Sequence, residues 1–317
     1  MSQPLVAIVI PVFNEESVLP ELFARMSAVF DGDRSCQWCA VLVDDGSRDR
    51  SAEMIAAQAA RDSRWELIEL SRNFGFQSAL AAGMVHAGRK ADAVVTMDAD
   101  LQDPPELIPE LVAAWRGGAG IVRAVRRSRA ETGLRRLALD AFHAVFRRLT
   151  DFPIEPNTGT FGLLGREAVD AFNSLPERHR FFPGLRAWVG YPAADVLYDR
   201  QERAAGQPQQ TFRRLVRYAL DGLFSFSHLP LRVLTFFGVF VALMGFAIGT
   251  FFIVRRILGV ETAQLGFTTL VTLLIFLGGV QLIGIGVLGE YLGRTYDEVK
   301  RRPLYLLKPP RRRPPSA

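Results

Sequence analysis

The chain has 317 residues, of which 49% are hydrophobic and 22% are charged, with a formal net charge of +5. This charge is modest, and no platform of aromatic and basic residues accompanies it, which argues against a nucleic acid partner. Cys36 and Cys39 form a single Cys-x-x-Cys pair, and without a second pair they do not complete a zinc site. We expect both to be inert thiols in a reducing compartment.

Short apolar runs, which predict strands, alternate with longer amphipathic segments, which predict helices, over roughly the first two thirds of the chain. The predicted strands are 6–10, 40–43, 66–70, 93–97 and 121–125, and the predicted helices are 16–30, 51–60, 77–86 and 105–115. This order predicts an α/β fold with a mostly parallel sheet and helices on both faces.

Polar clusters follow three of the predicted strands, at residues 11–15, 44–47 and 98–103. Because the carboxyl ends of parallel strands line one rim of such a sheet, we expect the clusters to converge on one pocket. The carboxylates of Asp98 and Asp100 are hard oxygen ligands that suit Mg²⁺ or Mn²⁺ together with substrate phosphates. An ordinary surface turn is the alternative reading of the same residues.

The pair Asp44 and Asp45 can accept hydrogen bonds from ribose hydroxyls or base N–H groups, and Gly46 permits a tight turn beside a ligand. A solvated turn with a helix cap at Ser47 or Asp49 is the alternative. Neither a dinucleotide-binding glycine motif nor a P-loop occurs in the sequence. A metal held by Asp100 and its neighbours would therefore have to neutralise a diphosphate.

Two segments without charged residues, 233–254 and 265–289, are each long enough to cross a bilayer. Buried core helices are the alternative, but two such runs in succession favour a transmembrane hairpin. Arginines and lysines flank both ends of the pair, which predicts that both termini and the α/β domain are cytoplasmic. The N-terminal segment lacks the basic region of a signal peptide. Segments 134–149 and 212–226 mix apolar and basic residues, as interfacial helices do.

The sequences at 11–15, 43–47, 70–75 and 98–103 resemble the motifs of family 2 glycosyltransferases, whose fold is the Rossmann-like GT-A fold. More narrowly, the chain is similar to the polyprenyl-phosphate branch, which includes dolichol-phosphate mannose synthases and bacterial bactoprenol glucosyltransferases. Segments 175–181, 187–190 and 220–227 also match the bacterial members, so the likeness covers nearly the whole chain.

The resemblance implies roles for individual residues. The nucleoside would be held by Pro11, Phe13, Glu15, Asp44 and Asp45. The nucleotide or sugar would lie near Ser71, Arg72 and Asn73, and the diphosphate near Ala99, Asp100 and Gln102. The metal candidates are Asp98, Asp100 and Gln102, and the catalytic candidates are Asp100 with the phosphate-directed arginines Arg126 and Arg203. Two departures from the family are Gly162 and Gln209, where some relatives carry an arginine and a lysine.

The resemblance further implies an inverting transfer of a hexose, with glucose from UDP-glucose as the first choice, to polyprenyl phosphate in a bacterial inner membrane. The alternatives are transfer from GDP-mannose, a processive polysaccharide synthase, which would need an absent Gln-x-x-Arg-Trp element, and a degenerate non-catalytic membrane partner.

The expected parts are a GT-A domain (1–210), a juxtamembrane helix (211–230), a transmembrane hairpin (231–289) and a basic tail (290–317). The tail ends in Pro-Pro-Arg-Arg-Arg-Pro-Pro, which cannot pack a core. Glycines in the second span would allow helices to approach closely, which leaves room for a homo-oligomer.

Overall fold

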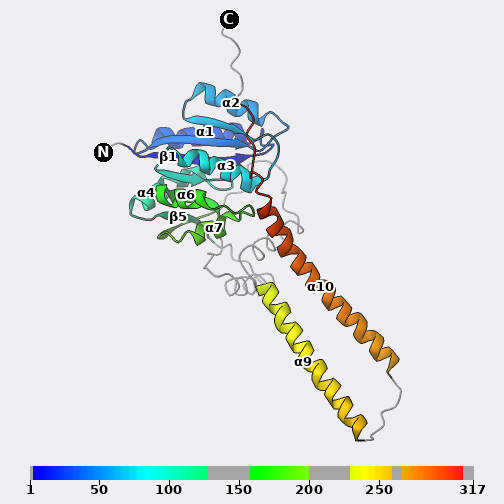
Figure 1. Cartoon of the computed structure of the whole chain (residues 1–317). Coiled ribbons are helices and arrows are strands. Elements are labelled where there is room, and N and C mark those ends of the chain that lie inside the picture. The colour runs from blue at the N-terminus through cyan, green and yellow to red at the C-terminus, as the bar shows by residue number, and fades with distance from the viewer. Residues whose placement is uncertain (1–2, 128–157, 200–228, 259–265, 310–317) are drawn as a thin grey trace.

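A computed structural model describes residues 3–127, 158–199, 229–258 and 266–309. Seven strands form one sheet in the order β3-β2-β1-β4-β6-β5-β7 (Figure 1). The strands are β1 (Leu5–Val12), β2 (Gln37–Asp44), β3 (Trp65–Glu69), β4 (Ala93–Thr96), β5 (Ile121–Arg126), β6 (Thr158–Gly165) and β7 (Ala193–Tyr198). Strand β6 runs antiparallel to β4 and β5, and the other neighbours pair in parallel.

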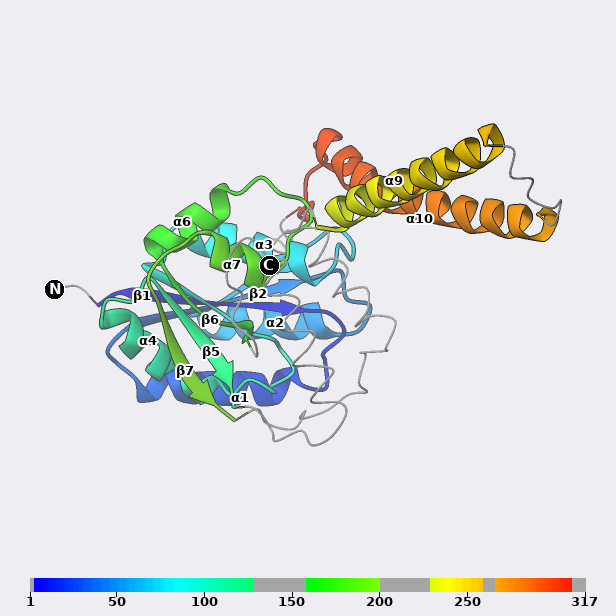
Figure 2. The ribbon, with the colours of Figure 1, turned by 90° about the horizontal axis from the view of Figure 1, so that it is seen from below.

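Helices cover both faces of the sheet (Figure 2). One face carries α1 (Leu19–Gly32), α2 (Ser51–Arg61) and α4 (Ile108–Arg116), which follows the short 3-10 helix η1 (Pro105–Leu107). The other face carries α3 (Phe76–Gly88), α6 (Arg166–Ser174) and α7 (Phe182–Trp188). Two buried apolar clusters, one on each face, fill the space between helices and sheet. The predicted Rossmann-like sheet with helices on both faces is therefore confirmed.

The alternating pattern predicted every element up to β5, with ends that differ by a few residues. Strands β6 and β7 and helices α6 and α7 were not predicted. Strand β6 reads Thr-Gly-Thr-Phe-Gly-Leu-Leu-Gly, and its glycines weaken the strand signal. Strand β7 lies at the sheet edge, where only Tyr198 is buried, so it lacks a strong apolar run.

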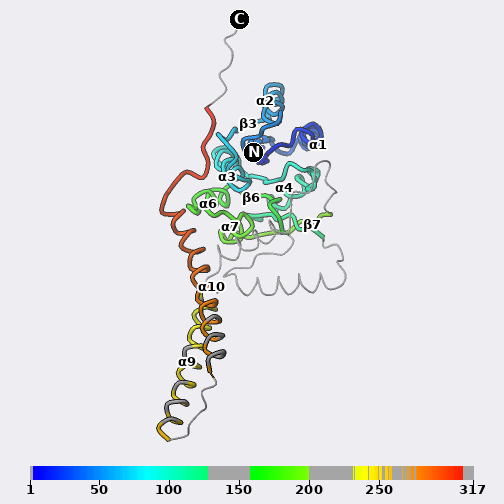
Figure 3. Tube along the Cα trace, turned by 90° about the vertical axis from the view of Figure 1, so that its right-hand side faces the viewer, coloured from blue at the N-terminus to red at the C-terminus, as the bar shows by residue number. Residues whose placement is uncertain are grey.

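Beyond the sheet, α9 (Leu229–Ile257) and α10 (Phe267–Val299) run side by side away from the α/β domain (Figure 3). They coincide with the two predicted apolar segments, and they carry most of the exposed large hydrophobic side chains of the described residues. Within the described residues, one helical stretch, Phe276–Val299, is long and apolar enough to span a bilayer. The apolar stretch Val233–Ile248 of α9 is shorter, so two spans stay a prediction.

Helix α10 continues to Val299, well beyond the expected end of the hairpin at Gly289. Near the end of the apolar stretch, Glu290 pairs with Arg294 one turn later, with Arg294 Nη2 3.0 Å from Glu290 Oε1. After α10 the chain returns to the sheet, where Leu307 pairs with Leu70 in an antiparallel bridge. The amphipathic segments 134–149 and 212–226 lie outside the described residues.

Cys36 and Cys39 are both buried free thiols, and they belong to apolar clusters on opposite faces of the sheet.

Near Cys39, the carboxylate of Glu66 on β3 contacts two basic side chains at the C-terminal end of α3. It lies 2.7 Å from His86 Nε2 and also pairs with Lys90 Nζ. The hydrogen bond from His86, with the charge of Lys90, lowers the pKa of Glu66 to about 2 despite partial burial.

We expect Glu66→Gln to lower stability at neutral pH by about 1 kcal/mol, a value discounted for solvent screening. In the folded protein the pKa of Glu66 lies below its ordinary value of 4.5. The ionised side chain therefore contributes to the free energy of unfolding above pH 4.5, and this contribution is lost as the pH falls toward 2. Thermal unfolding of the detergent-solubilised chain should therefore show the difference between wild type and variant shrinking in acid. Glu53→Gln, which removes an exposed pair with Arg50, is the control and should show no pH-dependent difference.

Candidate active site

The carboxyl ends of four parallel strands meet at one rim of the sheet. Two backbone hydrogen bonds show that the turns after β1, β2 and β4 lie side by side: Asp45 N donates to Val12 O (2.9 Å), and Met97 N donates to Val9 O (3.1 Å). Leu70 N donates to Asp44 O (2.9 Å), which brings in the turn after β3. The structure thus brings together the clusters at 11–15, 44–47 and 98–103 and adds 71–75 to them.

The turns after β1 and β2 are joined by side chain to backbone hydrogen bonds. Asn14, whose φ is +56°, donates its N–H to Ser47 Oγ (3.0 Å) and accepts from Arg48 N (2.8 Å) through Oδ1. Glu15 N donates to Ser51 Oγ (2.9 Å). Ser47 therefore does not cap α2, and the alternative of a solvated capping turn is wrong for this residue.

Asp44 and Asp45 are both buried at the end of β2. The carboxylate of Asp44 accepts from Ser47 N at 3.2 Å, within its own turn. Asp45 reaches across to the next turn, where Oδ1 accepts from Phe74 N (2.7 Å) and Oδ2 from Gly75 N (2.9 Å). Burial raises the pKa of Asp45, and these two N–H groups oppose that rise. Asp45 thus ties the β2 turn to the 71–75 loop, whose Ser71, Arg72 and Asn73 side chains are exposed.

Three carboxylates lie close together after β4. Asp98 Oδ1 accepts from Thr160 Oγ1 (2.9 Å) on β6, and Asp100 Oδ1 accepts from Gln102 N (3.2 Å). Burial, followed by repulsion from Asp103 and Asp100, raises the pKa of Asp98 to about 6. Such mutual repulsion disfavours three negative charges in one place, and a cation would relieve it.

Arg126, at the end of β5, belongs to the same cluster. Its Nε donates to Tyr198 Oη (3.1 Å), and its Nη2 lies 3.7 Å from Asp103 Oδ1. The Tyr198 hydroxyl in turn donates to Asp103, and both burial and that carboxylate raise the pKa of the hydroxyl. This chain of contacts holds a guanidinium beside the acidic residues.

Oxygen ligands for a cation are present at this turn, but they do not form a complete site. Among the described residues, no group of three or more His, Cys, Asp or Glu side chains has a metal-binding arrangement. Asp98 and Asp100 supply carboxylate oxygens, Gln102 is half-buried beside them, and Asp103 Oδ2 is buried without a hydrogen bond donor in the part of the chain described here. Mg²⁺ typically takes one or two carboxylates and completes its shell with water and substrate phosphates.

Comparison with known proteins agrees with these motifs. The family model described as glycosyl transferase family 2 matches residues 7–172. The chain belongs to this family. An uncharacterised glycosyltransferase of Synechocystis is 46% identical over 95% of this chain and 94% of its own length. A prophage bactoprenol glucosyl transferase homologue of Escherichia coli K12 is 40% identical over 96% of this chain and 98% of its own.

Among solved structures, the chain is similar to glucosyl-3-phosphoglycerate synthase of Mycobacterium tuberculosis, crystallised with Mn²⁺, UDP and glucosyl-3-phosphoglycerate. The identity is 18% and the TM-score 0.45, over 70% of this chain and 78% of that one.

Most residues expected from the family resemblance lie at this rim. Pro11 and Ala99 are buried, and Phe13, Glu15 and Gln102 are half-buried. Arg203 and Gln209 lie outside the described residues. No role is predicted from the sequence for Asp103, Thr160 or Tyr198. Asp103 could have been found as the last acid of the Asp98–Asp103 motif, whereas Tyr198 comes from a strand that carries no motif.

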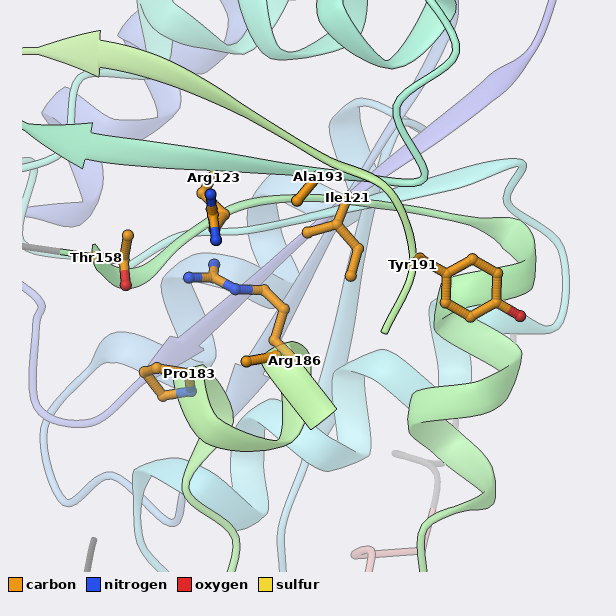
Figure 4. A pocket seen from close by; sticks show the side chains of 8 residues that line it. Ile121, Arg123, Thr158, Pro183, Arg186, Tyr191 and Ala193 are labelled. Carbon is orange, nitrogen blue, oxygen red and sulfur yellow. The ribbon is translucent and has the colours of Figure 1, made fainter. Parts of the chain in front are cut away.

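Gly162, one of the two departures from the family, lies beside a buried arginine. A Cβ atom at this position would lie 2.5 Å from Val122 O and 3.0 Å from Nη1 of Arg186 on α7. Arg186 lines a pocket of about 140 Å³ between α7 and the β5 and β7 edge, together with Arg123 and Thr158 (Figure 4). A basic group therefore approaches Gly162 from another element of the fold.

We expect Gly46→Ala to disturb the site strongly. Gly46 has φ +71°, and a Cβ atom there would lie 2.5 Å from Arg72 C and 2.6 Å from Asn73 N. The strain and clash should cost about 2 kcal/mol of stability and displace the 71–75 loop. Thermal unfolding of the purified chain measures the loss.

Gly32→Ala is the matched control, because nothing lies within 4 Å of a Cβ at that helical position. Its stability should change by less than about 1 kcal/mol. Equal stability of the two variants would contradict the packing at Gly46.

Proposed function

We propose that the protein is an inverting hexosyltransferase that moves a sugar, glucose in the first instance, from UDP-glucose to a polyprenyl phosphate at the membrane surface. The observation that carries this proposal is the convergence of four polar turns at one sheet rim in a family 2 chain. Relatives of nearly equal length that are named bactoprenol glucosyl transferases support glucose as the sugar and a lipid as the acceptor.

The donor would lie across the rim, with its nucleoside over the turns after β1 and β2. Phe13 and Glu15 would contact the nucleoside directly, because they are half-buried rather than fully enclosed. Asp44 and Asp45 are buried and bonded to backbone N–H groups, so their first task is to shape the turns around it. Their remaining lone pairs would serve the ribose or base.

The diphosphate would lie at the acidic turn after β4. A Mg²⁺ or Mn²⁺ ion bound by Asp98, Asp100 and Gln102 would neutralise charge on the departing nucleoside diphosphate. Arg126 is held by Tyr198 and Asp103 on the same side and would contact a phosphate group through its guanidinium.

The acceptor explains why no strong general base is required. A phosphate monoester has a second pKa of about 6 and is already an anionic nucleophile near neutral pH. The protein has to align that oxygen behind the anomeric carbon and exclude water from the site. Displacement from the opposite side inverts the configuration, so an α-linked donor should give a β-linked product.

Membrane attachment supplies the acceptor. The exposed apolar side chains of α9 and α10 are suited to lipid, and we propose that both helices span the inner membrane with the α/β domain in the cytoplasm. The lipid tail of the acceptor then stays in the bilayer while its phosphate reaches the interface beside the domain.

We expect Asp100→Asn to lower sugar transfer by about a hundredfold or more, because it removes a negative ligand from the diphosphate site. The test uses the full chain in liposomes with undecaprenyl phosphate, Mg²⁺ or Mn²⁺, and a panel of labelled nucleotide sugars. Product configuration is read by NMR. Asp92→Asn is the matched control, because Asp92 lies at the opposite end of β4, where its carboxylate accepts from Leu5 N (2.8 Å).

Each outcome of the donor panel separates the hypotheses. Preference for GDP-mannose would replace the glucose assignment, and a polymeric product would identify a processive synthase. No transfer from any donor would favour a non-catalytic membrane partner. Full activity of the Asp100 variant, or a product with retained configuration, would contradict the mechanism.

A further inference from the structure

The chain after α10 crosses back over the α/β domain instead of leaving it. Lys300 N donates to Tyr296 O (3.1 Å) and Arg301 N to Glu298 O (3.1 Å), which closes the helix. Arg301 has φ +49°, a left-handed conformation that turns the chain. The following residues run along the domain toward β3 (Figure 3).

Residues 304–308 lie at the β3 edge of the sheet, and residues 306–308 pair with the end of that strand. Ser71 N donates to Leu306 O (2.8 Å), and Lys308 N donates to Glu69 O (2.8 Å). These bonds frame the antiparallel bridge between Leu70 and Leu307. The Lys308 ammonium also lies 3.5 Å from Glu69 Oε1. This segment, residues 304–308, is the C-terminal strap, and it provides backbone partners for Glu69 O and Ser71 N at the end of the sheet edge.

The C-terminal strap and the end of α10 are fixed to the domain at further points. Glu298 Oε1 accepts from Arg178 N (2.8 Å), and Asp297 Oδ2 lies 3.5 Å from His179 Nε2. Tyr305 packs against the apolar cluster under α3, and burial raises its pKa. The end of α10 is therefore attached to the α/β domain at several points.

The strap ends at the loop that we expect to face the donor. Loop 71–75 is held on its inner side by Asp45, which binds Phe74 N and Gly75 N. On its outer side Ser71 is bonded to the strap, and Phe74 packs against the same apolar cluster as Tyr305. Within the loop, the Arg72 guanidinium stacks 4.0 Å from the Phe74 ring centroid. Two independent attachments thus determine where the exposed side chains of the loop lie.

We propose that the C-terminal strap is a positioning element of the donor site, which fixes loop 71–75 and links it to α10. Its effect on catalysis rests on the proposed function, whereas its effect on the loop does not. Leu306 and Lys308 act through loop 71–75 and need not touch a substrate.

The first test compares two full-domain chains that keep both helices, one ending at Pro303 and one ending at Pro309. Hydrogen exchange is measured at the amides of Phe74 and Gly75, which are bonded to Asp45 and not to the strap. We expect exchange about tenfold faster in the shorter chain and unchanged in the longer one. Equal exchange in the two chains would overturn the proposal.

The second test measures transfer kinetics on the same pair. We expect the donor KM to rise about fivefold or more in the shorter chain, with kcat and the acceptor KM within about twofold. A uniform fall in kcat with an unchanged donor KM would mean that the strap only stabilises the fold. If the wild-type chain transfers no sugar, the proposed function fails and hydrogen exchange alone decides the role of the strap.

A point variant covers the case in which the shorter chain does not fold. Lys308→Pro removes the N–H that donates to Glu69 O, whereas Lys308→Ala removes only the ion pair. The proline variant should reproduce the faster exchange at Phe74 and Gly75, and the alanine variant should not. Identical exchange in both would overturn the proposal.

Discussion

The parallel pairing of β1 with β2 on one side and with β4 on the other is the constraint on which the candidate site depends. Residues 6–10 of β1 have no exposed surface, so their register is specified by packing on both faces of the sheet. A shift of one residue would exchange the two faces. The same register places the turns after β1, β2 and β4 at the same rim of the sheet. Residues that are far apart in the sequence become neighbours for this reason alone.

The turns themselves are specified by buried polar groups. Burying the carboxylates of Asp44 and Asp45 costs free energy unless they are hydrogen-bonded. Both accept hydrogen bonds from backbone N–H groups, and these bonds stabilise the observed conformation of each turn. The acidic turn after β4 differs. There Asp98 and Asp103 repel each other, and Asp103 keeps one oxygen without a donor among the described residues. Arg126 offsets only part of the charge of these carboxylates, whereas Asp44 and Asp45 next to them are satisfied, and such a local departure from full pairing is typical of a functional site.

Periodicity could predict the fold as far as β5, because each strand there is an apolar run between amphipathic helices. It could not predict β6, in which Gly162 leaves room for the close approach of Val122 O and Arg186 Nη1 from other elements. The acidic motif predicted which part of the chain forms the rim. Tyr198 could not be predicted, since its contact with Asp103 spans 95 positions and follows from the placement of β7 beside β5.

The C-terminal segment shows a second limit of sequence reasoning. The prolines and basic residues of the region 290–317 are typical of a solvated tail, yet residues 306–308 within it pair at an open sheet edge, whose backbone partners composition does not reveal. The consequence concerns geometry at the membrane. Four residues, 300–303, separate the apolar stretch Phe276–Val299 from the strap, so the connection between helix and sheet is short. In the proposed membrane arrangement, the hydrogen bonds at the end of β3 would set the height of the rim above the bilayer, and a lipid acceptor would meet the donor site at that height.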